Sequence, residues 1–176
     1  MHLNRILGTI AAIWGAGGAI AILAYAVVRM VGHTRDAFMT PWNLWHYLVL
    51  VSWAVFMAYS EGYRGFQRGY SPRVAARALY LRRRSTLSRL LLAPLFCMGF
   101  FHAPRKRRIT VFVLLILIAS IVVCFQFIPQ PWRGILDFGV IIGLSWGLIA
   151  TLLFLAKFWM LPEVPFDAEV VEPSGP

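Results

Sequence analysis

The chain has 176 residues, of which 60% are hydrophobic and only 14% are charged, and its mean hydropathy is +0.70. Soluble domains carry about 25% charged residues, so this composition argues against an ordinary soluble protein and favours an integral membrane protein. The formal net charge is +10, and twelve of the 17 basic residues lie between Arg64 and Arg108. Because 15 of the 17 are arginines, either phosphate recognition or a GC-rich coding bias explains the composition.

Four apolar stretches have the length of a membrane-spanning helix, which needs about 20 residues. They cover residues 6–28, 41–60, 109–128 and 135–158. The expected fold is therefore an all-α integral membrane protein whose four-helix transmembrane domain occupies residues 1–160. A Pro-rich tail with four of the seven acidic residues follows at 161–176. We expect this tail to be flexible, with docking onto the basic residues as the alternative.

The first stretch, 6–28, carries small residues four positions apart at Ala11, Gly15 and Ala19. Such a ridge permits close helix packing in lipid. The sequence "AYA" at 24–26 is similar to a signal-peptide cleavage site. The apolar run is longer than the usual 7–15 residues of a signal peptide, so we interpret it as a span.

The second stretch, 41–60, has Thr40 as the expected N-cap and Pro41 at the first helical position. If this helix continues to Tyr70 at 100° per residue, its residues separate into a charged, a small and an aromatic face. These faces comprise Glu61, Arg64 and Arg68; Gly62, Gly65 and Gly69; and Tyr59, Tyr63, Phe66 and Tyr70. The glycine face predicts close packing of another segment, because three glycines would otherwise weaken a helix.

Glu61 is the only acidic residue between Asp36 and Asp137, and it stands where the apolar run ends. We interpret it as an ion-pair partner of Arg64 and Arg68 at the inner boundary of the bilayer. Two alternatives remain: a lipid-headgroup or phosphate site in which Glu61 orients the arginines, and a catalytic or proton-carrying carboxylate.

The connection 61–108 holds the twelve clustered basic residues and is expected to be cytoplasmic, which places both termini in the cytoplasm. Ser71 and Pro72 predict the start of a short helix. We expect Arg73, Arg77, Arg105 and Arg107 to bind anionic lipid or an acidic partner, together with Glu61, Arg64 and Arg68. A topology signal alone is the simpler alternative, and nucleic acid is not expected as a partner.

A short apolar run, 90–101, contains Pro94 and Gly99 and has basic residues on both sides. It is too short to cross a bilayer, so it is expected to be interfacial or re-entrant.

The fourth span, 135–158, carries a second small-residue ridge at Gly139, Gly143 and Gly147. Two such ridges predict that the first and fourth spans pack closely, within one chain or across a dimer. Asp137 stands four residues after Arg133, which predicts an ion pair near the outer interface.

No residue pattern indicates a cofactor or metal. The four histidines, His2, His33, His46 and His102, have no neighbouring ligand-type residues, and zinc requires three or four ligands. Cys97 and Cys124 stand in apolar stretches and are interpreted as small hydrophobic residues. No nucleotide-binding loop, serine-nucleophile motif or HExxH sequence occurs.

These observations lead to three hypotheses. The first is a non-catalytic inner-membrane scaffold or accessory subunit, with a membrane-protein partner or a second copy of itself. The second is an oligomeric small transporter or channel with His46 or Asp137 at its outer mouth. The third is a membrane enzyme that acts on a phosphorylated lipid through Glu61, nearby arginines and His102.

Overall fold

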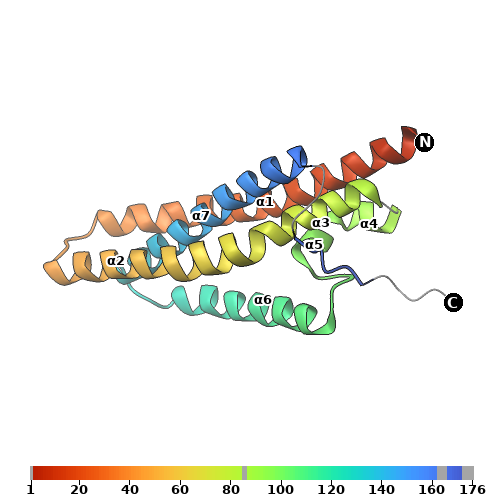
Figure 1. Ribbon diagram of the computed structural model, residues 1–176. Coiled ribbons are helices and arrows are strands. Elements are labelled where there is room, and N and C mark those ends of the chain that lie inside the picture. Colours follow the sequence, from red (N-terminus) through yellow and green to blue (C-terminus); the bar gives the residue numbers. More distant parts are fainter. Residues whose placement is uncertain (1, 85–86, 162–165, 172–176) are drawn as a thin grey trace.

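The computed structural model describes residues 2–84, 87–161 and 166–171. This part of the chain is entirely helical and contains no strand. Figure 1 shows an elongated bundle in which long helices run back and forth along one common direction. The N-terminus and the C-terminal segment lie at the same end of the bundle.

Three of the described helices are long and apolar enough to cross a membrane. They belong to α1 (His2–Phe38), α6 (Arg105–Phe125) and α7 (Trp132–Met160). Helix α1 continues ten residues past its expected end at residue 28, because no proline interrupts the chain before Pro41. The connection between the first two long helical segments is consequently shorter than the predicted 29–40, and His33 lies on a helix instead of in a loop.

The second predicted span, 41–60, is divided between two kinds of helix. An α-helix, α2 (Leu44–Met57), passes directly into a π-helix, η1 (Ala58–Tyr70), and then into α3 (Ser71–Arg83). Met57, Ala58, Tyr70 and Ser71 all have right-handed helical backbone angles, so residues 44–83 form one unbroken helix. The α-helical part alone is only 14 residues long.

Both predicted N-caps are wrong. Asn43, not Thr40, caps α2: its side chain accepts a hydrogen bond from the backbone N–H of His46, and the ring of His46 accepts one from the N–H of Asn43. Ser71 caps no helix because α3 continues directly from η1. Its hydroxyl instead meets the hydroxyl of Thr151 on α7, at 2.9 Å.

The short apolar run 90–101 forms two helical turns, α4 (Leu87–Leu91) and α5 (Ala93–Met98). Gly99 ends α5 with φ +92°, a left-handed conformation that glycine adopts without steric cost. Helix α5 lies against the middle of α1, where a Cβ on Gly15 would be 2.7 Å from Cys97 Sγ. A Cβ on Gly18 would similarly be 2.5 Å from Pro94 Cγ.

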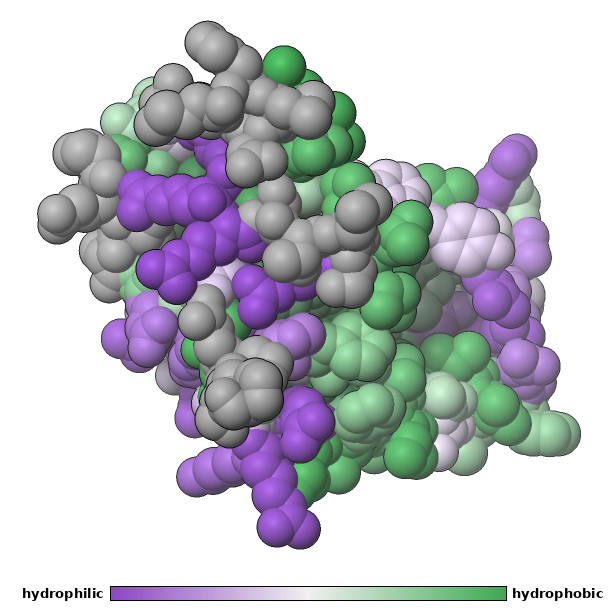
Figure 2. Space-filling model, turned by 90° about the vertical axis from the view of Figure 1, so that its right-hand side faces the viewer, coloured by the Kyte–Doolittle hydropathy of each residue, from purple (hydrophilic) through white to green (hydrophobic). Residues whose placement is uncertain are grey.

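Helix α7 lies at the centre of the packing and contacts α1, α2, η1 and α3. Helix α6 differs from the others: it packs extensively against none of them, and none of its residues is buried. Figure 1 shows α6 running beside the bundle and set apart from it. Figure 2 looks onto the end at which α3 and α4 lie and shows hydrophilic residues gathered there, next to a hydrophobic surface.

Candidate functional site

The glycine ridge of α7 receives side chains from the 44–83 helix and not from α1. A Cβ on Gly139 would collide with the ring of Trp53, and one on Gly147 would collide with the ring of Phe66. Helices α1 and α7 do pack on each other, but through a different face of α7. The ridge of α1 in turn contacts α3 and α5, because Ala11, Ala19 and Gly15 face residues such as Ala78 and Cys97.

Glu61 lies against this ridge, halfway along α7. Its Cβ and Oε2 are 3.1 and 3.3 Å from the position that a Cβ on Gly143 would occupy. Gly143 is near the middle of a 29-residue candidate span. The carboxylate is therefore beside the interior of a spanning helix, and not beyond its end as the sequence had suggested.

The expected pairing of Glu61 with Arg64 and Arg68 is not among the ion pairs of the described residues. Arg64 and Arg68 are exposed, and the Arg68 guanidinium lies 5.4 Å from the centre of the Tyr63 ring. The π-helical register explains this difference, since hydrogen bonds five residues apart change the angle at which successive side chains leave the helix. The face assignment at 100° per residue does not apply within η1.

Only one of the three glycines of η1 makes a close contact. A Cβ on Gly62 would be 2.9 Å from Trp146 Cγ, so Gly62 admits this indole. At Gly65 and Gly69 an added Cβ would meet only the carbonyl oxygens of Ser60 and Arg64, each at 3.4 Å.

Arg77 is 3% exposed and its guanidinium binds three backbone carbonyls. Nη1–H donates to Phe96 O at 2.8 Å and to Phe101 O at 3.1 Å, and Nη2–H donates to Glu169 O at 2.9 Å. Its Cζ also lies 5.2 Å from the centre of the Phe96 ring. Three of the five N–H donors of Arg77 are thus used inside the protein.

The C-terminal residues 166–171 dock onto this arginine. The N–H of Val171 donates to His102 O at 2.9 Å, and Glu169 Oε1 lies 4.0 Å from Arg73 Nε. The ring of Phe166 stacks on that of Phe158, with centroids 5.9 Å apart. This part of the tail therefore covers α3 and the end of α7.

The remaining basic candidates, Arg105 and Arg107, lie on the first turn of α6, where Arg105 is exposed and Arg107 is half-buried. They are therefore separate from the Arg77 cluster, and the structure does not bring all the predicted arginines into one site.

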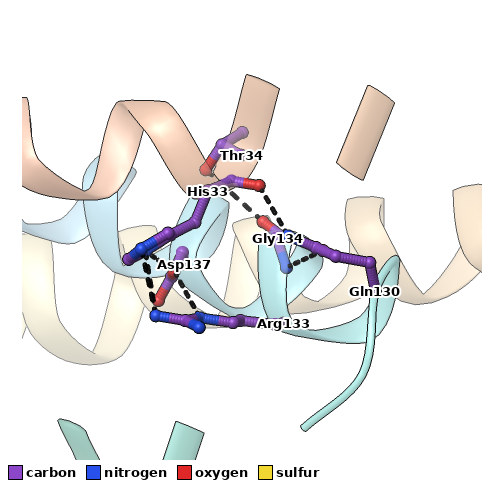
Figure 3. A network of polar contacts seen from close by, with 6 residues as sticks. All are labelled: His33, Thr34, Gln130, Arg133, Gly134 and Asp137. Atoms are coloured by element: carbon purple, nitrogen blue, oxygen red, sulfur yellow. Dashed lines mark hydrogen bonds and ion pairs between the residues drawn. The ribbon is translucent and has the colours of Figure 1, made fainter. Parts of the chain in front are cut away.

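A polar cluster joins α1 to the start of α7 (Figure 3). His33 Nδ1 is 3.1 Å from Asp137 Oδ2, and Arg133 Nη2 is 3.0 Å from His33 Nε2. Arg133 Nε is 4.0 Å from Asp137 Oδ2, so the expected Arg133–Asp137 pair is present, although His33 is the nearer partner. Arg133 Nη2 is also 3.3 Å from His33 Nδ1, so the guanidinium lies over the face of the imidazole ring while Nδ1 is at hydrogen-bonding distance from Asp137.

Two further side chains complete this cluster. Gln130 Nε2–H donates to His33 O at 3.1 Å, while Gln130 Oε1 accepts from the N–H of Gly134 at 3.1 Å. The Thr34 hydroxyl lies 3.5 Å from Gly134 O. Sequence reasoning missed His33, Gln130 and Thr34 in this role. The uninterrupted sequence from Arg29 to Thr40, which contains no proline, was the available signal that the helix continues.

The described clusters differ in composition from the ligand sets of metal sites. Within the described residues no three His, Cys, Asp or Glu side chains come together as metal ligands. His46 takes part in the cap of α2 and contacts the ring of Trp132, with centroids 4.9 Å apart. The clusters instead join helices to one another.

Comparison with protein-family models, curated proteins and solved structures found no match to this chain. The fold and these clusters define an all-α protein with helices that are long and apolar enough for a multi-pass membrane protein. Its more specific role has to be argued from the geometry alone.

Proposed function

We propose that this protein is a non-catalytic scaffold or accessory subunit of a cell's inner membrane, which binds other membrane helices and anionic lipid or an acidic partner. In this proposal α2 and η1 together supply the fourth crossing, because residues 44–70 form 27 residues of continuous helix. The connection after this crossing, 71–108, and both termini lie on the cytoplasmic side, as the basic residues of that connection favour. The first ten residues of the expected 61–108 connection belong to the crossing in this proposal.

The observation that carries the proposal is the separation of α6 from the rest of the chain. Helix α6 has 21 residues, none of them buried, and Ile116 and Leu117 are 65% and 51% exposed. An apolar helix in lipid gains little from packing on its neighbours merely because it is apolar. Helix α6 is therefore not needed to hold this bundle together, and beyond the contacts of Val111 and Phe112 with Gly99 and Phe100 it offers most of its circumference to a helix of another subunit.

The charged turn of α6 supports the second half of the proposal. Arg105, Lys106 and Arg108 are exposed and stand directly before the apolar part of this helix. Basic residues at this position attract anionic lipid headgroups by about 1 kcal/mol each.

The test labels a cysteine that the chain already contains. Cys124 on α6 is exposed, whereas Cys97 is buried, so a benzophenone maleimide applied to native membranes labels Cys124 selectively. Illumination is expected to link α6 to one defined protein. A product of twice the chain mass identifies a homo-oligomer, and mass spectrometry identifies any other partner.

The matched control is the double variant Cys124→Ser/Ser52→Cys, which carries the same label on an exposed position of α2. Random collisions would give products from both helices in similar yield. Equal yields, or a labelled α6 that gives no protein product, would overturn the proposal.

The position of Glu61 favours a second candidate function, an oligomeric small transporter or channel. A carboxylate beside the interior of a spanning helix is costly in hydrocarbon, and such groups commonly line ion or proton pathways. Irregular π-helical segments also recur at functional sites. Purified protein in liposomes would then carry a proton or cation flux that Glu61→Gln abolishes, and a flux of zero in the unaltered protein would remove this candidate.

A further inference from the structure

A groove runs along the face of α7 that is turned away from α1. It encloses about 680 Å³ and is lined by one side of α7, from Ile141 to Lys157, together with Gln67 of η1. Its walls are mainly apolar: Ile149 and Leu153 line it and are 58% and 65% exposed. No helix of the described chain fills this groove.

A hydrogen bond between two helices lies at the groove, toward its end opposite Lys157. The indole N–H of Trp146 donates to Gln67 Oε1 at 2.7 Å. Ser145 lies beside this pair in the groove lining. The polar groups thus divide the groove: Ile141 and Ile142 line it on one side of them, and the longer part of the apolar wall lies between them and Lys157.

The opposite end of the groove is cationic. Lys157 is exposed and makes no ion pair within the described part of the chain. Two residues further along, the Arg82 guanidinium lies 4.4 Å from the centre of the Trp159 ring. A tryptophan with basic residues beside it is typical of the boundary between hydrocarbon and headgroups.

The part of the groove between Ser145 and Lys157 is about as long as one leaflet is thick. Twelve residues separate Ser145 from Lys157, which at 1.5 Å per residue corresponds to about 18 Å. Half of a hydrocarbon core of about 30 Å is about 15 Å. An acyl chain that begins at Lys157 would therefore end near the Gln67–Trp146 bond.

We propose that this groove binds an anionic phospholipid of the cytoplasmic leaflet, with one acyl chain against Ile149 and Leu153 and the phosphate at Lys157. The proposal rests on the membrane orientation given under the proposed function, but it requires no partner protein. Charge distinguishes the lipid from helix α6 of a second copy. In a shared membrane, the basic turn with Arg105 would lie at the same level as Lys157 and repel it.

The test compares lipid retention by the full-length protein in nanodiscs that contain equal amounts of phosphatidylglycerol and phosphatidylcholine. Native mass spectrometry then gives the ratio of the two lipids that remain bound. We expect Lys157→Gln to lower this ratio about fivefold, which corresponds to about 1 kcal/mol for one basic residue. The matched control, Arg29→Gln on α1, removes an exposed basic residue that does not line the groove and is expected to leave the ratio within about twofold of the original.

A second pair of variants tests the acyl chain. Ile149→Trp fills the groove and is expected to lower the total retained lipid, whereas Leu117→Trp on the exposed surface of α6 is not. Circular dichroism verifies that each variant keeps its helices. Equal effects of Lys157→Gln and Arg29→Gln, or no effect of Ile149→Trp, would overturn the proposal and leave only general attraction of lipid to basic residues. Because the readout is lipid, its failure is distinguishable from the absence of a protein cross-link on α6.

Discussion

Arg77 is an arginine from a basic stretch of the sequence that is buried and joins three segments of the chain. Its sequence environment is that of a cationic surface, with Arg73 and Arg82 close by. The structure instead closes three carbonyls around it, from Phe96, Phe101 and Glu169. Arginine suits this position because its rigid planar guanidinium presents several donors at fixed angles, whereas a lysine ammonium is a compact point charge.

Replacement of Arg77 by methionine is expected to lower the free energy of unfolding by about 3 kcal/mol, because it leaves buried carbonyls without donors. Chemical unfolding in detergent, followed by circular dichroism, measures this loss. Arg73→Met is the matched control: Arg73 is 4.0 Å from Glu169 and partly exposed, so it should change stability by less than about 1 kcal/mol. Similar losses for both variants would contradict a special role for the three carbonyls.

His102 provides a pH-dependent contribution to stability. The Nδ1 atom of its ring is buried and has no hydrogen-bond partner among the described residues, and its backbone adopts a left-handed φ of 51°. Burial, and then the positive charges of Arg89 and Arg77, lower the pKa of His102 below its ordinary value of 6.5. The unfolded chain therefore takes up this proton at a higher pH than the folded chain does.

Since the unfolded state binds more protons, the folded protein should lose stability as the pH falls through 6.5 and below. Unfolding measured at pH 7.5 and at pH 5.5 tests this. His102→Asn should show a smaller difference between these two conditions than the unaltered protein, and an unchanged difference would rule out His102 as the source.

At the scale of the elements, the contact between α7 and the 44–83 helix depends on missing side chains. Gly139→Ala is expected to destabilise the protein by about 1–3 kcal/mol, because the added methyl group would overlap the Trp53 ring. Gly17→Ala in α1 is the matched control. A Cβ there meets nothing within 4 Å, so the substitution should be neutral or stabilising by up to about 1 kcal/mol. Thermal unfolding measures the stability of both variants. Equal changes in stability would contradict the conclusion that the glycine ridge of α7 requires glycine.

The helices and the contacts between them could be predicted from the sequence only in part. The apolar runs that became α6 and α7 were recognisable because composition and length suffice to identify a helix of the right size. The partner of each ridge was not recognisable, because Gly139, Gly143 and Gly147 would allow any large side chain to approach. No residue pattern in the sequence distinguishes the π-helical hydrogen bonding of η1 from that of an α-helix. The sequence predicts a helix through Tyr70. It does not predict whether each N–H bonds the carbonyl four or five residues earlier, and this difference decides whether Glu61 and Arg64 share a face.

At the scale of the whole molecule, the two ends of the bundle are fixed in different ways. One end is held by the cluster of His33, Arg133 and Asp137, which joins α1 to α7 through side chains. At the other end Arg77 joins α3, α5 and the tail through backbone carbonyls. Between these ends the contacts are mostly between small and aromatic residues. Charged groups therefore join the helices near the two ends of the bundle, and close packing joins them along its length.

The distance along the chain between Arg77 and its last partner has a consequence for synthesis. Glu169 follows Arg77 by 92 residues. At a synthesis rate of about 5–20 residues per second, the ribosome makes Arg77 about 5–18 seconds before Glu169. Helices α6 and α7 are translated within that interval, so both can enter the membrane before the third carbonyl reaches the guanidinium. The segment around Glu169 thus completes the structure around a residue that was made 92 residues earlier.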